Sequence, residues 1–186
     1  MDFLARRLSV PARQLGAPGP DTATLRRLLG MAIRVPDHGK LTPWRLITVA
    51  GADKRVLGER LAELFARKHP DKPDAKKEKE RKRYTWAPSV VVVVARIDPD
   101  SRIPSQEQLL SAGCVAYNLL LGAQALGFGA QWLTGWAAYD RDAATVLGLA
   151  ADERVVGFVH IGTATREIPE RARPELDSVV DAWTAT

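Results

Sequence analysis

Residues 89–96 read SVVVVVAR, and this stretch decides the fold class of the chain. Valine is β-branched and favours extended backbone, so five valines in a row, Val90 to Val94, predict a strand. Successive side chains of a strand point to opposite faces of a sheet, and here both faces are apolar. Such a strand needs cover on each side, which places it at the centre of a sheet flanked by helices.

The rest of the chain provides elements for such a sandwich. Periodic apolar residues, capping residues and prolines predict helices over 21–35, 53–68, 105–127 and 140–149. Short apolar runs predict further strands over 45–50, within 129–135 and over 154–164. A chain of 186 residues suits one domain with a sizeable core, so we expect a single domain over 1–186. The predicted fold class is α/β, an α+β sandwich of four or five strands with helices on both faces.

The composition is typical of a soluble globular protein, with 46% hydrophobic and 26% charged residues. The one cysteine, Cys114, excludes an intrachain disulfide, and the N-terminal MDFLARRLSV lacks the apolar core of a signal peptide. We therefore expect a cytoplasmic protein. The uncharged stretch 109–126 approaches the length of a membrane span, but Ser111, Asn118 and Gln124 interrupt it and favour a buried helix.

A strongly charged segment, PDKPDAKKEKERKR, occupies residues 70–83. A basic run of this kind can bind nucleic acid, and a nucleic-acid-binding module using 72–83 stays an alternative function. No aromatic residues interleave the charges, as a stacking platform for single strands requires. We therefore favour a solvated helix or a mobile loop.

Several catalytic signatures are absent from the sequence. It contains no P-loop, no GxGxxG fingerprint and no GxSxG elbow. The histidines, His38, His69 and His160, are scattered, which argues against a metal site. Cys114 lies within an apolar helix, where we expect it to pack rather than to react. These absences favour a protein that leaves the difficult chemistry to a cofactor.

Arginines gather near both ends of the chain, at Arg6, Arg7 and Arg13 and at Arg166, Arg171 and Arg173. Arginine holds phosphate through two parallel, charge-assisted hydrogen bonds. Ser9 adds a hydroxyl close to the first group. The two groups form one phosphate site only if the fold brings the ends of the chain together.

Four segments, in this order, give the sequence a family resemblance: RRLSVPARQLG, RVPDHGKLTPWR, SAGCVAYNLLLGAQALGFGAQWLTG and VVGFVHIGTATREIPERARPELDSVV. Together they resemble the nitroreductase superfamily, in particular its small bacterial members, over nearly the whole chain. The resemblance implies a central, mostly antiparallel sheet flanked by helices. It also implies a homodimer with two FMN sites at the subunit interface. NADH or NADPH would donate electrons, and a nitroaromatic, a quinone or a related small molecule would accept them in ping-pong turnover. Neither nucleic acid nor membrane is expected as a partner.

By resemblance, the cofactor-binding residues are Arg7, Leu8, Ser9, Arg34, His38, Trp132, Leu133, Thr134 and Arg173. The family start usually reads Arg-Arg-Ser, whereas this chain has leucine at position 8, so either Arg6 or Arg7 takes the phosphate role. His38 would complete the site of the other subunit, and Trp44 would anchor its loop in the core. The role of Lys40 stays open. A flavin-binding carrier or sensor without reductase activity is the second alternative function.

Overall fold

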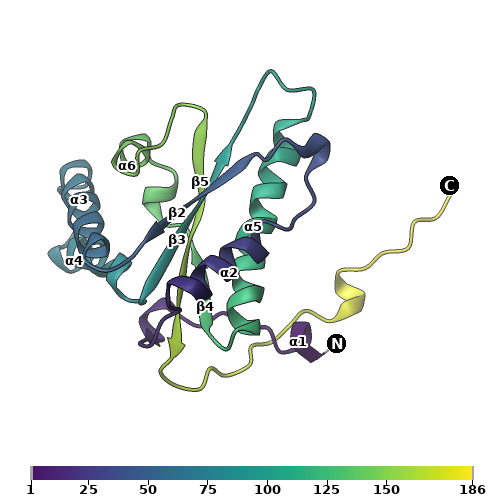
Figure 1. Ribbon diagram of the computed structural model, residues 1–186, viewed down its shortest axis with the longest axis horizontal. Helices are drawn as coiled ribbons and strands as arrows, with labels where there is room; N and C mark the ends of the chain where they lie inside the picture. The colour runs from purple at the N-terminus through teal and green to yellow at the C-terminus, as the bar shows by residue number, and fades with distance from the viewer. Residues whose placement is uncertain (1, 186) are drawn as a thin grey trace.

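The computed structural model describes residues 2–185 and contains one sheet between two layers of helices (Figure 1). The α-helices are α1 (Asp2–Ala5), α2 (Thr22–Ala32), α3 (Asp53–Lys68), α4 (Asp74–Lys82), α5 (Ser105–Ala125) and α6 (Arg141–Val146). The strands are β1 (Leu15–Gly16), β2 (Trp44–Val49), β3 (Ser89–Arg96), β4 (Gly129–Leu133) and β5 (Glu153–Ala164). Single 3-10 turns are η1 (Ala12–Gln14), η2 (His38–Lys40), η3 (Arg83–Thr85), η4 (Trp136–Ala138) and η5 (Leu176–Ser178).

The sheet confirms the predicted fold class. Its strands follow the order β1-β5-β3-β2, β4 also pairs with β5, and every pairing is antiparallel. The valine strand β3 lies between β2 and β5 and is buried from Ser89 to Ala95. The prediction that this strand is central is therefore correct.

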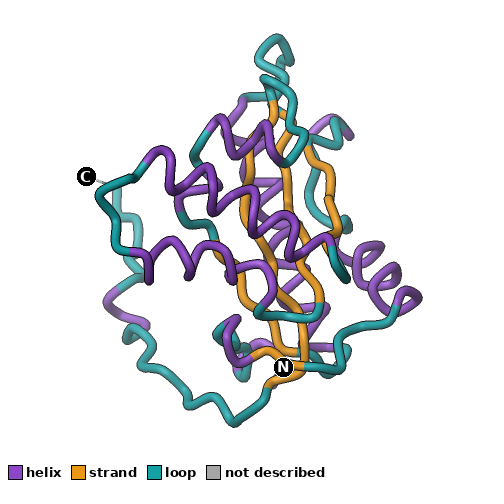
Figure 2. Tube along the Cα trace, turned by 90° about the vertical axis from the view of Figure 1, so that its left-hand side faces the viewer, coloured by secondary structure: helices purple, strands orange, loops and turns teal. Residues whose placement is uncertain are grey.

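The valines of β3 divide the interior into two cores. Val91 and Val93 pack in a cluster with side chains of α2 and α5, such as Leu28 and Leu119. The other three valines, Val90, Val92 and Val94, belong to a second cluster with residues of α3, η4 and α6. Figure 2 is viewed from the side of α3 and α4 and shows helices lying in front of the strands. Each fully buried valine stabilises the fold by roughly 1.5–3 kcal/mol, so β3 anchors both helical layers.

Helix α5 is apolar all round, but the chain buries only part of its surface. One face packs against the sheet through residues such as Val115 and Leu119. Another part is exposed, with Leu110 at 60% and Tyr117 at 41% accessibility. Cys114 is also exposed, so the expectation that it packs inside is wrong. A uniformly apolar helix gives no local signal of which side faces the sheet. Among the described residues, no helix has the length and apolarity needed to cross a membrane.

The charged segment forms the solvated helix α4, with one departure from expectation. Most of its side chains are exposed, but Glu80 is only 1% accessible and Arg83, directly after the helix, is half-buried. Glu80 accepts two hydrogen bonds from Arg83, of 2.8 and 2.9 Å, and one from Trp136 Nε1 at 3.2 Å. Composition alone did not separate these two residues from their solvated neighbours.

The two ends of the chain meet. Arg173 Nη2 donates a hydrogen bond of 3.1 Å to the carbonyl oxygen of Arg7. Residues 169–185 are exposed, and Figure 1 shows the yellow C-terminal segment running past α1 and away from the sheet. The segment is thus an extended arm on the surface of the chain.

Candidate cofactor site

The segment that carries Arg7 and Ser9 is held against the edge of the sheet. Val10 N donates a hydrogen bond of 3.0 Å to the carbonyl oxygen of Ala130 in β4. Just before it, Arg7 Nη1 donates to Ser9 Oγ at 3.4 Å. A guanidinium and a hydroxyl are therefore neighbours on a segment that β4 positions.

Arg173 brings a second guanidinium to the same place from the far end of the chain. It contacts the Arg7 carbonyl oxygen and forms an ion pair of 2.9 Å with Glu170. The sequence allowed a single phosphate site only if the fold brings the two ends of the chain together. The contact between Arg173 and Arg7 shows that it does. Two guanidiniums and a hydroxyl form a donor set suited to a phosphate.

An open groove of about 460 Å³ adjoins this donor set. It is lined by Arg7, Ser9, Tyr117, Leu120, Trp132 and Thr134. Four of the residues predicted from the sequence therefore share one groove. Tyr117 and Leu120 were not predicted, because they lie in the uniformly apolar α5 and carry no local sign of a site.

The other predicted residues of these two segments lie close by. Leu8 lines a neighbouring cavity of about 220 Å³, together with Arg6 and Arg166. Leu8 and Ser9 therefore contribute to different cavities, as consecutive residues of an extended segment do. Leu133 is half-buried in β4 and pairs with Phe158 of β5.

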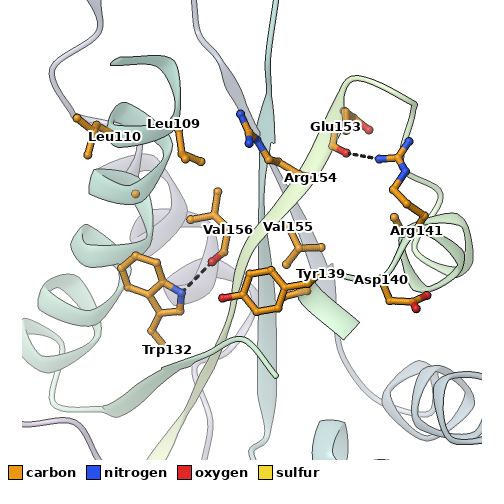
Figure 3. Close-up of a pocket in the computed structure, with 13 residues that line it drawn as sticks. Leu109, Leu110, Trp132, Tyr139, Asp140, Arg141, Glu153, Arg154, Val155 and Val156 are labelled. Atoms are coloured by element: carbon orange, nitrogen blue, oxygen red, sulfur yellow. Dashed lines mark hydrogen bonds between the residues drawn. The ribbon is translucent and has the colours of Figure 1, made fainter. Parts of the chain in front are cut away.

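Trp132 has a well-defined position at the edge of the groove. Its indole Nε1 donates to the carbonyl oxygen of Val156 at 3.1 Å, which Figure 3 marks with a dashed line. The ring lies on the backbone of Gly157, where an added Cβ would stand only 1.9 Å from Nε1. Only glycine at position 157 leaves room for the indole. Trp132 lines both the groove and a larger cavity, so its side chain separates the two.

Arg34 and His38 do not join this group within one chain. His38 Nδ1 lies 2.7 Å from Glu107 Oε2, in the first turn of α5, whereas Leu120 lines the groove. A helix rises about 1.5 Å per residue, so Glu107 and Leu120 are roughly 20 Å apart along α5. Arg34 lies nearer, because its carbonyl oxygen accepts a hydrogen bond of 3.0 Å from Asn118 Nδ2.

Arg83 is a candidate residue that the sequence did not indicate. A Cβ on Gly135, directly after Thr134, would stand 3.3 Å from Arg83 Nη1. The guanidinium therefore lies against the backbone of the Trp132–Gly135 loop. Burial opposes its charge, but the hydrogen bonds and attraction of Glu80 outweigh burial and raise the pKa of Arg83. Arg83 is thus a fixed cation beside the loop, missed because it follows a run of solvated charges.

A match to a protein family agrees with this donor set, with the apolar groove and with the antiparallel sandwich. Residues 4–163 match the model of the nitroreductase family. The chain belongs to the nitroreductase family. The match begins just before the arginine segment and ends within β5, so it includes the groove residues from Arg7 to Thr134.

Relatives in the nitroreductase family support the assignment. A Haemophilus influenzae protein described as an NAD(P)H nitroreductase is 35% identical over 162 residues, which cover 87% of each chain. The Escherichia coli K12 protein YdjA, also described as an NAD(P)H nitroreductase, is 28% identical over 163 residues, or 88% of this chain and 87% of YdjA.

Solved structures support the nitroreductase-like fold. A nitroreductase-like family protein from Bacillus cereus superimposes with a TM-score of 0.82 at 23% identity, covering 97% of this chain and 94% of that one. The nitroreductase NfnB from Sphigopyxis sp. strain HMH, described as dependent on FMN and NADPH, has a TM-score of 0.75 at 22% identity, covering 97% and 96%. At this identity, both likenesses bear on the fold alone.

No metal centre accompanies the groove in this part of the chain. Within residues 2–185, no group of three His, Cys, Asp or Glu side chains is placed to hold a metal ion.

Proposed function

We propose that this member of the nitroreductase family binds FMN and transfers electrons from NADH or NADPH to nitroaromatic, quinone or related acceptors. The observation that carries the proposal is the convergence of Arg7, Ser9, Trp132 and Thr134 on one groove. The names of the relatives, NAD(P)H nitroreductases, and of NfnB, an FMN- and NADPH-dependent enzyme, support the choice of cofactor and donor.

The residues present fit FMN. Arg7 and Arg173 supply positive charge for a phosphate, and Ser9 supplies a hydroxyl for the phosphate or the ribityl chain. Tyr117, Leu120 and Trp132 give the groove apolar walls for a flat ring system. The groove volume of about 460 Å³ lies within the usual range of small-molecule sites, roughly 300–1,000 Å³.

The protein would bind and orient the cofactor, and the cofactor would supply the two-electron chemistry when bound. Thr134 and Leu133 present the loop to the groove, and Leu8 contributes its backbone beside Arg7. Arg83, which is ion-paired with the buried Glu80, would hold the backbone of this loop in place beside the bound cofactor. Because donor and acceptor use the same open groove, we expect them to alternate in ping-pong turnover.

We further propose a homodimer with two shared sites. The exposed apolar residues of α5, such as Leu110 and Tyr117, and those of the arm, such as Trp183 at 87% accessibility, require cover. His38 lies far from Arg7 along α5 and is exposed, so it is available to the groove of a second copy. Arg34 would accompany it.

Anaerobic spectroscopy tests the reductase activity. The protein reconstituted with FMN should retain the flavin on gel filtration, and NADH or NADPH should bleach its visible band. A nitroaromatic or quinone should restore the band. A protein that retains no flavin contradicts the proposal. A yellow protein that neither nicotinamide cofactor bleaches supports the alternative of a carrier or sensor.

Complementation tests the shared site. Arg7→Ala and His38→Ala proteins, each deficient in FMN binding, are unfolded and refolded together. In a mixed dimer one site collects both defects and the other is intact, so about half of the sites of the mixed dimers should regain normal affinity. Recovery requires that the two residues come from different chains. If both serve one chain's own site, no affinity returns, and a monomer on sedimentation contradicts the idea directly.

The colour and binding properties of the purified protein also test the alternative of a nucleic-acid-binding module. A colourless protein that binds nucleic acid with a steep salt dependence would support the alternative based on residues 72–83. A cytoplasmic location and a single domain over 1–186 stay predictions.

A further inference from the structure

Polar side chains interrupt the apolar helix α5, and two of them hold the loop between α2 and β2. Asn118 Nδ2 donates a hydrogen bond of 3.0 Å to the carbonyl oxygen of Arg34, and Ser111 Oγ donates to the carbonyl oxygen of Pro36. Positions 111 and 118 lie about two helical turns apart, so they share one side of α5. These two polar residues therefore fasten the backbone of the loop that carries Arg34 and His38.

Glu107 lies one turn before Ser111 and contacts a side chain of this loop instead of its backbone. Its Oε2 atom is 2.7 Å from His38 Nδ1. An ionised carboxylate only accepts hydrogen bonds, so Nδ1 carries a proton and donates it. In a neutral imidazole with the proton on Nδ1, the other nitrogen, Nε2, is a hydrogen-bond acceptor.

The second nitrogen of His38 is turned away from α5. The two ring nitrogens point away from each other, so a ring that directs Nδ1 at Glu107 directs Nε2 away from the helix. The space that both residues line between the loop and α5 has a volume of only about 10 Å³, which is too small for a ligand. The His38 side chain is 62% exposed. Nε2 therefore faces the outside of the chain.

Asp37 fixes the backbone beside this ring. Its carboxylate accepts hydrogen bonds from Leu41 N, at 3.1 Å, and from Thr42 N, at 2.9 Å. Lys40 and Thr42 have φ angles of 55° and 53°, a region that side chains with a Cβ seldom adopt without supporting contacts. The loop thus presents His38 from a fixed backbone, and the direction of the ring depends on a side-chain contact.

We propose that Glu107 is a positioning residue for the cofactor site. It holds His38 with the proton on Nδ1, so that Nε2 accepts a hydrogen bond from a hydroxyl group of the cofactor in the groove of a second copy. This step rests on the proposed function, in which His38 completes the site of the other subunit. The ribityl chain of FMN supplies hydroxyl donors, whereas its ionised phosphate offers acceptors only. Glu107 acts through His38 alone.

Nitrogen NMR of the protein without flavin tests the protonated position. Labelling with nitrogen-15 histidine marks only His38, His69 and His160, and His38→Ala identifies the signals of His38. At the alkaline end of a pH titration, where the ring is neutral, the proton of His38 should lie on Nδ1. Glu107→Ala should move it toward Nε2, the position that histidine prefers in water. A proton on Nε2 in the unaltered protein, or no change in the variant, would overturn the proposal.

Flavin affinity, measured by fluorescence titration at the same pH, tests what the pair does. Glu107→Ala should weaken FMN and riboflavin by the same factor, about two- to tenfold, because both carry the ribityl chain. A loss for FMN alone would place His38 on the phosphate and contradict the proposal. In a protein that already carries His38→Ala, adding Glu107→Ala should cause no further loss. Additive losses would show that Glu107 does not act through His38.

The matched control is Glu63→Ala, at an exposed glutamate of α3. It should change neither the NMR signals of His38 nor the flavin affinity. If Glu63→Ala reproduces the effects of Glu107→Ala, a general effect of charge replaces the contact between Glu107 and His38, and the proposal is wrong.

This inference and the proposed function can fail separately. A protein that retains no flavin contradicts the proposed function and the cofactor contact of Nε2, while the NMR signals still decide whether Glu107 orients His38. A flavoprotein in which Glu107→Ala changes neither the NMR signals of His38 nor the flavin affinity contradicts this inference alone.

Discussion

Arginines at two places in the molecule behave differently. At the first residue of β5, the buried Glu153 accepts a hydrogen bond of 2.7 Å from Arg45 Nη2, one of 3.2 Å from Arg96 Nε and one of 3.0 Å from Ala150 N. Together they lower the pKa of Glu153 to about 2, with the Arg45 hydrogen bond the largest cause. Here one buried carboxylate holds two guanidiniums within the chain.

The cluster of Arg7, Ser9 and Arg173 is built the other way. Its guanidiniums contact a hydroxyl, a carbonyl oxygen and one exposed carboxylate, that of Glu170. Glu170 is exposed and pairs with Arg173, whereas Arg7 has a hydroxyl as its side-chain partner, so the Arg7 guanidinium stays available to a ligand. The difference teaches that an arginine's role follows from its partner: a buried carboxylate indicates a structural arginine, whereas a neutral partner or an exposed carboxylate leaves the arginine available for binding. Four predictions test this contrast.

The largest effect is expected at the cluster around Glu153. Glu153→Ala leaves Arg45 without its buried partner, and breaking a buried ion pair costs about 3–5 kcal/mol. Because Arg96 is half-exposed and can be hydrated, we expect a loss in the free energy of unfolding of about 4 kcal/mol rather than more. Urea denaturation measures it. A loss below about 1 kcal/mol would show that the cluster is not structural.

Arg7→Ala should affect binding instead of stability. Losing a charge-assisted hydrogen bond costs about 1.5–3 kcal/mol, so the affinity for FMN should fall roughly tenfold or more. Riboflavin, which lacks the phosphate, is the control, and its affinity should change much less. Equal losses for both ligands would place Arg7 away from the phosphate.

A buried group without a partner provides the third test. His160 is fully buried in β5, and neither ring nitrogen has a hydrogen-bond partner within the described chain. Burial, with the nearby charges of Arg83 and Lys54, lowers the pKa of His160 from 6.5 to about 4. The unfolded chain then binds more protons than the folded chain between these pH values, so stability is complete above pH 6.5 and falls as the pH drops toward 4.

Between pH 7 and 5 this difference should lower the free energy of unfolding by roughly 2 kcal/mol. Urea denaturation at several pH values measures the slope, and His160→Leu should flatten it in this window. A variant that keeps the full slope would assign the pH dependence to other groups.

The smallest effect is expected at an exposed pair. Arg55 and Glu59 lie one turn apart on α3, with a distance of 2.7 Å between Nη1 and Oε1, and the arginine side chain is 67% exposed. Such pairs contribute about 0.3–0.5 kcal/mol on a helix, so Glu59→Gln should leave urea denaturation nearly unchanged. A loss comparable with that of Glu153→Ala would mean that buried and exposed ion pairs do not differ in their contribution to stability.

Much of the site was predictable because its residues occur in short, characteristic segments. Arg7, Ser9, Trp132 and Thr134 were all predicted, and the structure brings them to one groove. Trp44, expected to anchor its loop, is 7% accessible. Arg83 was missed because a run of charges gives no local sign that one member turns inward. Cys114 was placed wrongly because a helix without a polar face does not indicate its buried side.

The sequence by itself determined the local structure: a strand of five valines that needs cover on both faces, the helices around it and the chemistry of each end of the chain. Only the tertiary structure decided which of these elements meet. The approach of Arg173 to Arg7, the contact of Arg83 with the Trp132–Gly135 loop and the distance of His38 from the groove all depend on chain packing. Periodicity reports whether a side chain prefers water or an apolar interior, because that preference is local. It carries no information on which distant residue will be the neighbour, because that depends on how the helices pack on the sheet.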